Sequence, residues 1–102
     1  MEKTVLNEVF DYLKRIEAVD TESEFSTNWL CRSESYMRSL RFKQVQPSMG
    51  TLAICASKLS HYGNRLKEEQ KHANISAQLL QLSNACNQKI NHLSSEQWIK
   101  GV

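Results

Sequence analysis

The sequence predicts an all-α fold, a bundle of four to five helices with a long helix in its C-terminal part. Only 3 glycines and 1 proline occur among 102 residues, too few for the many tight turns of a β-sandwich or barrel. Apolar residues recur at steps of three and four along most of the chain, the spacing of amphipathic helices. Serine and threonine stand just before several of these periodic segments, where they cap helices.

The first two helices are expected over about residues 3–18 and 22–30. The first carries an apolar stripe, Leu6, Val9, Leu13 and Ile16. Thr21 and Glu24 form a capping-box pattern at the start of the second, because a threonine oxygen can accept from an orphan amide three residues on. The second helix is expected to bury Phe25, Trp29 and Leu30.

A third helix is expected over about residues 34–42, with Ser33 as its cap. A loop should follow, because the residue before Pro47 disfavours helix, and Ser48 should cap a fourth helix. The inward residues of both helices are expected to be Tyr36 or Met37, Leu40, Leu52, Cys55, Ala56 and Leu59. Gly63 fits a stop or kink just after that stripe.

The last long helix is expected over about residues 64–92. A second cap pattern, from Ser94 to Gln97, indicates a turn, after which a short helix would return Trp98 and Ile99 to the core. We therefore divide the chain into a first domain, residues 1–63, and a helical extension, residues 64–102, which either dimerises or packs on its own domain. A homodimer interface is expected at Ile75, Leu79, Leu82, Cys86 and Ile90.

Charge is distributed unevenly along the chain. Residues 25–67 carry seven basic side chains against Glu34 alone, a net charge of +6, whereas residues 1–24 carry −4. A basic stretch of this kind favours a polyanionic partner, although a solvated helix face gives the same pattern.

Other functions find no support in the sequence. It has no glycine-rich phosphate loop, and His61, His72 and His92 lack the ligand spacing of a metal site. We therefore expect no enzyme activity, catalytic residue, metal, cofactor or small-molecule ligand. The sequence has neither an apolar run of roughly 20 residues nor a secretory signal, so we expect no membrane association and a cytoplasmic location. The three cysteines are odd in number and widely spaced, which argues against a disulfide framework.

Residues 21–60 resemble the phage-repressor-like (Cro/C1-type) helix-turn-helix family. The resemblance is carried by SESYMRSL at residues 33–40, a short basic loop, Pro47-Ser48, and LAICASKL at residues 52–59. It implies a compact helix-turn-helix bundle whose third helix enters the major groove of double-stranded DNA. Cys31 occupies the place where the family usually has glycine, and Arg32 the place of a buried valine.

The resemblance assigns the DNA contacts to the third helix and its flanking loops. Arg38 and Ser39 are placed to read bases, since arginine pairs with guanine in bidentate fashion. The full expected set is Arg32, Ser33, Glu34, Ser35, Arg38, Ser39, Arg41, Lys43, Gln44 and Gln46. The leading hypothesis is thus a sequence-specific DNA-binding protein, a small bacterial or phage-type transcriptional regulator acting as a dimer. The alternative is a helical protein-protein interaction module, adaptor or antitoxin-like, that does not read DNA.

Overall fold

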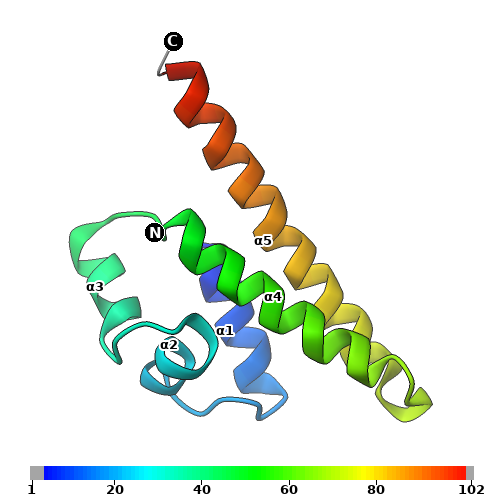
Figure 1. Ribbon diagram of the computed structural model, residues 1–102. Coiled ribbons are helices and arrows are strands. Elements are labelled where there is room, and N and C mark those ends of the chain that lie inside the picture. The colour runs from blue at the N-terminus through cyan, green and yellow to red at the C-terminus, as the bar shows by residue number, and fades with distance from the viewer. Residues whose placement is uncertain (1–3, 101–102) are drawn as a thin grey trace.

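The computed structural model describes residues 4–100, and every regular element in that range is helical (Figure 1). The all-α prediction, with its long C-terminal helix, is confirmed. The elements in chain order are α1 (Val5–Arg15), α2 (Glu22–Leu30), α3 (Tyr36–Lys43), α4 (Met49–Leu66), the short 3-10 turn η1 (Gln70–His72) and α5 (Ala73–Lys100). Residue 3, where the first helix was expected to begin, lies outside the described range.

The predicted caps of α2 and α4 are present. The Thr21 hydroxyl accepts a hydrogen bond from the Glu24 amide at 3.1 Å, and the Ser48 hydroxyl accepts one from the Thr51 amide at 3.2 Å. The Glu24 carboxylate reaches back to the Asp20 amide, 3.3 Å away. Both helices thus begin with orphan amides satisfied by side chains, as the sequence pattern predicts.

Helix α3 begins later than expected. Its N-cap is Ser35, whose side chain makes no capping hydrogen bond, rather than Ser33. The hydroxyls of Ser33 and Ser35 lie 3.4 Å apart, so the two serines pair with each other. The loop before α3 is therefore two residues longer than the sequence indicates.

Helices α4 and α5 form an antiparallel hairpin against which α1 and α2 pack (Figure 1). Gly63 was expected to stop or kink α4. It does not stop the helix, which continues through it to Leu66. A Cβ atom on Gly63 would lie 2.8 Å from Cγ and Cδ2 of Leu80 in α5. The glycine therefore serves close approach of the two helices, and the hairpin turns between residues 67 and 72.

Two serine side chains of α5 reinforce this close packing. Ser76 donates to the Gly63 carbonyl at 2.6 Å and Ser83 donates to the Ala56 carbonyl at 2.7 Å. Both serines are buried, and each hydrogen bond satisfies a hydroxyl that would otherwise be unpaired in the interior. The hairpin is joined by hydrogen bonds as well as by apolar contact.

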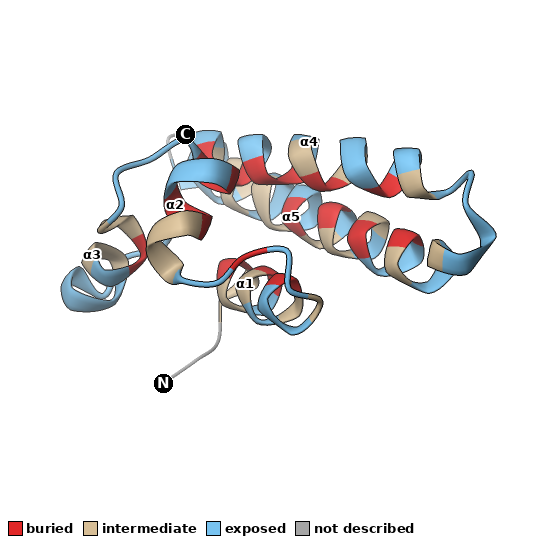
Figure 2. Ribbon diagram, turned by 90° about the horizontal axis from the view of Figure 1, so that it is seen from below, coloured by how far each residue is buried: buried red, intermediate tan, exposed pale blue. Residues whose placement is uncertain are grey.

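One core spans the whole described chain. Figure 2 shows the buried segments of α1, α4 and α5 facing one another. Fully or nearly buried side chains from every α-helix form this core, among them Leu6, Phe25, Met37, Leu59, Leu79 and Cys86. Residue 63, the expected domain boundary, lies inside α4, and α5 supplies part of the same core as α1.

The thiols of Cys55 and Cys86 meet within this core. A hydrogen bond to Cys86, reinforced by burial, raises the pKa of the Cys55 thiol above its ordinary value. Cys55 therefore stays protonated and behaves as a small core residue. All three cysteines, including exposed Cys31, are free.

The expected turn at Ser94 is absent. Helix α5 is 28 residues long and runs through Ser94 and Gln97 to Lys100, because this stretch contains neither proline nor glycine. The Ser94 hydroxyl contacts Met49 Sδ at 3.1 Å instead of capping a new helix. Trp98 and Ile99, expected to return to the core, are 64% and 60% exposed on the end of α5 that projects beyond the bundle (Figure 1).

Candidate nucleic-acid interface

The turn between α2 and α3 has a left-handed backbone at Cys31. This residue has φ 55° and ψ 41°, a conformation that glycine adopts most easily. The amides of Cys31 and Arg32 both donate to the Ser26 carbonyl, which ends α2. Although cysteine stands where the resemblance expects glycine, the backbone at this position has the conformation that favours glycine.

Replacement of Cys31 tests this strain. We expect Cys31→Val to lower the free energy of unfolding by about 1–2 kcal/mol, since a β-branched residue disfavours the left-handed region. Cys31→Gly should be neutral or stabilising by up to about 1 kcal/mol, because relief of strain offsets the greater freedom of the unfolded chain. Urea unfolding of the two variants measures both values. Equal destabilisation by both substitutions would contradict the assignment of strain to this backbone position.

Arg32 holds this turn against α4. Its Nε donates to the Thr51 hydroxyl at 2.9 Å, and a terminal nitrogen lies 3.5 Å from the Ser48 hydroxyl. The guanidinium also lies 5.8 Å from the centre of the Tyr36 ring, and the Tyr36 hydroxyl reaches Thr51 at 3.3 Å. Arg32 was expected to contact phosphate, but the structure gives its side chain a positioning role between the turn and the start of α4.

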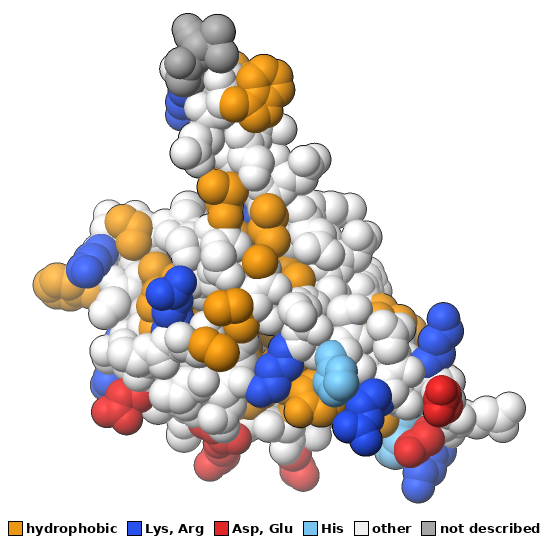
Figure 3. All heavy atoms as spheres, viewed as in Figure 1, with side chains coloured by type: hydrophobic (Ala, Val, Ile, Leu, Met, Phe, Trp, Pro, Cys, Tyr) orange, Lys and Arg blue, Asp and Glu red, His pale blue; other side chains and the backbone are white. Residues whose placement is uncertain are grey.

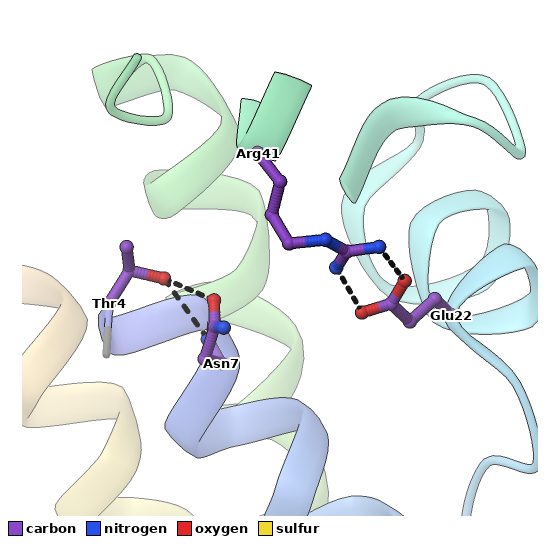
Figure 4. A network of polar contacts seen from close by, with 4 residues as sticks. All are labelled: Thr4, Asn7, Glu22 and Arg41. Carbon is purple, nitrogen blue, oxygen red and sulfur yellow. Dashed lines mark hydrogen bonds and ion pairs between the residues drawn. The ribbon is translucent and has the colours of Figure 1, made fainter. Parts of the chain in front are cut away.

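Arg41 holds α3 against the start of α2. Its two terminal nitrogens donate to the two carboxylate oxygens of Glu22 at 2.6 and 2.9 Å (Figure 4). The hydrogen bond to Glu22 raises the pKa of the Arg41 guanidinium above its ordinary value. The side chains are 41% and 29% exposed, so solvent weakens this pair. Arg41, a second expected phosphate contact, is therefore already paired with a carboxylate.

Two further basic side chains of α3 are exposed. Arg38 and Lys43 are exposed, and within residues 4–100 neither has a hydrogen bond or ion pair. Ser35 and Ser39 are half-buried beside them. Ser33, Glu34, Gln44 and Gln46 are exposed in the flanking loops. Most of the residues expected to contact DNA are thus exposed on α3 and its flanking loops.

Two exposed apolar side chains in and after α3 were not among the residues expected from the sequence. Phe42 is 89% exposed at the end of α3, and Val45 is 50% exposed in the loop that follows. Figure 3 shows hydrophobic and basic side chains next to one another over α3. The signal was present in the helical period, because inward-facing Met37 and Leu40 require Phe42 to face outward.

The expected dimer interface lies largely inside the chain. Leu79 is 2% exposed and Cys86 is fully buried, because both pack in the hairpin core. Ile75, Leu82 and Ile90 are partly buried against that core. Leu79 and Cys86 are therefore not available to a second copy, and the large exposed apolar residues of α5 within the described range are Trp98 and Ile99.

Comparison with known proteins gives a family whose function is unknown. A family model described as a family of unknown function (DUF6626) matches residues 6–99. Neither the curated proteins nor the solved structures contain a match to the chain. Within residues 4–100, no helix combines the length and the apolar character needed to cross a membrane.

Proposed function

We propose from the geometry that the protein, which belongs to a family of unknown function (DUF6626), binds double-stranded DNA through α2, α3 and the turn between them. The observation that carries the proposal is the left-handed turn at Cys31, which a short loop joins to α3. Two exposed cations of that helix, Arg38 and Lys43, have no partner within residues 4–100. A helix that inserts into the major groove needs such a face, and its flanking loops need donors for phosphates.

The details of the interface support the same proposal. Arg38 lies on the outer face of α3, where it suits bidentate contact with guanine. Lys43, Gln44 and Gln46 extend from the end of the helix, where they suit phosphate contact. Arg32 and Arg41 fix the position of α3 relative to α4 and α2. A cytoplasmic regulator of transcription is the role we propose for this surface.

Substitutions on α3 test DNA binding. We expect Arg38→Ala to weaken binding to a selected site by about 1–3 kcal/mol, with relaxed specificity at one base pair. Lys43→Ala should weaken all sequences about equally and make binding less dependent on salt, because it removes a phosphate contact. Fluorescence anisotropy with sites selected from a random DNA library measures both effects. Lys71→Ala, in the turn before α5, serves as the matched control and should change neither quantity.

DNA binding at low salt is the decisive measurement for this proposal. Phosphate contacts are strongest at low salt, so a DNA-binding protein of this kind must retain at least sequence-independent affinity there. If the folded wild-type protein shows no binding to any duplex at low salt, the proposal is wrong.

The second candidate is a helical interaction module that does not read DNA. It is favoured by exposed Trp98 and Ile99 on the projecting end of α5, and by Glu22, which neutralises Arg41 beside α3. The same projecting end is where we now place a homodimer contact, since Leu79 and Cys86 are buried. Light scattering on the eluting protein tests this homodimer contact. A dimer that Trp98→Ala converts to a monomer supports this contact, and a monomeric wild type excludes it.

A further inference from the structure

The side chain of Phe42 takes no part in the core of the described chain. Its side chain is 89% exposed, whereas Met37 and Leu40 supply the apolar contacts of α3 to the bundle. Among aromatic side chains such exposure is unusual, because the fold leaves nearly all of the ring in water. The exposed ring is therefore available to a partner.

The surroundings of Phe42 are cationic. Arg38 lies four residues earlier on the same face of α3, and Lys43 follows Phe42 directly. Both basic residues are exposed and lack a partner in the part of the chain that the structure describes. Figure 3 shows the mixture of hydrophobic and basic side chains on this side of the molecule. A fitting partner must combine negative charge with an accessible apolar group.

The major groove of DNA has this combination. Phosphates supply the negative charge, and the C5-methyl group of thymine is the apolar group exposed in the groove. Four residues of α-helix span about 6 Å, and successive base pairs lie about 3.4 Å apart. The side chains of Arg38 and Phe42 are therefore spaced to reach base pairs about two steps apart.

We propose, on the basis of the DNA-binding function above, that Phe42 determines specificity by contacting a thymine methyl group about two base pairs from the guanine contacted by Arg38. The contact is apolar, so it distinguishes thymine from cytosine and also from uracil, which lacks only the methyl group. A phosphate contact in the same place would not distinguish these bases. This difference makes the proposal testable at the level of a single methyl group.

The test uses the full-length protein and sites selected from a random DNA library. Each thymine of the selected site is replaced in turn by deoxyuridine, and the dissociation constant is measured by fluorescence anisotropy. For wild type we expect one replacement to weaken binding roughly fourfold, the effect of removing one buried methyl group. Phe42→Ala should bind the thymine and deoxyuridine duplexes equally, and Phe42→Leu should keep part of the discrimination. Ile54→Ala, an apolar change on exposed α4 surface, should retain the wild-type response.

The possible outcomes distinguish failure of the Phe42 contact from failure of the DNA-binding proposal. If wild type binds DNA but Phe42→Ala keeps the full response to deoxyuridine, Phe42 does not contact a thymine methyl and only this inference is overturned. If wild type binds no duplex at low salt, both proposals are overturned. In that case, binding to an acidic peptide is measured for both proteins. If wild type binds the peptide and Phe42→Ala does not, the face around Phe42 serves a protein partner.

Discussion

Phe25→Ala is expected to lower the free energy of unfolding by about 3–5 kcal/mol, a large part of the stability of a domain this size. Phe25 lies in α2, is fully buried, and its ring centre is 5.6 Å from that of Phe10 in α1 at a tilt of 53°. Removal of the ring leaves a cavity and loses the aromatic contact. Urea unfolding monitored by circular dichroism measures the effect.

Phe42→Ala is the matched control for this prediction. The chemical change is the same, but Phe42 is exposed, so the free energy of unfolding should change by no more than about 0.5 kcal/mol. Similar losses in the two variants would show that the contribution of Phe25 does not come from burial. The control also establishes that Phe42→Ala is folded, as the DNA experiments require.

Gly63→Val is expected to lower the free energy of unfolding by about 2–3 kcal/mol, since overpacking of a close helix contact forces displacement. A Cβ at residue 63 would be 2.8 Å from Leu80 in α5 and 3.4 Å from Cβ of Leu79. Displacement there would also disturb the hydrogen bond from Ser76 to the Gly63 carbonyl. Thermal unfolding of the variant and wild type measures the loss.

Two comparisons identify the cause. Leu80→Ala should reduce the additional cost of Gly63→Val, because it removes the side chain that a Cβ would meet; strictly additive losses would contradict this explanation. Gly50→Ala is the control for helix propensity. A Cβ there would have only the Arg32 guanidinium within reach, at 4.0 Å, so this substitution should stabilise by up to about 1 kcal/mol.

Local signals in the sequence predicted most helix positions. The caps at Thr21 and Ser48 and the stripe of α1 depend on residues within a few positions of one another, and these predictions are confirmed. The predictions that failed include the cap at Ser33, the stop at Gly63, the start of the last helix near residue 64 and the turn at Ser94. The role of Gly63 depended on Leu80, which packs against it from another helix. Such contacts between distant segments are not visible in a local pattern.

The candidate interface shows the same distinction. The basic residues of α3 and the outward position of Arg38 follow from helical period and charge. The pairing of Arg41 with Glu22 and of Arg32 with Thr51 each joins residues 19 positions apart. Only the tertiary structure shows that these two arginines position α3, whereas Arg38 and Lys43 remain for a partner. Whether the partner is DNA stays a prediction.

Helix α3 has few buried contacts with the rest of the bundle, and this should affect its dynamics. Met37 is its only buried residue, and its other attachments to the bundle include the side-chain contacts of Tyr36 and Arg41. Helix α4, by contrast, has six buried residues and two carbonyls bonded to α5 serines. We therefore expect backbone amides of α3 to exchange with deuterium through local opening, well before those of α4. A partner bound to the outer face of α3 would slow that exchange, so protection against deuterium would locate the binding surface even for an unidentified ligand.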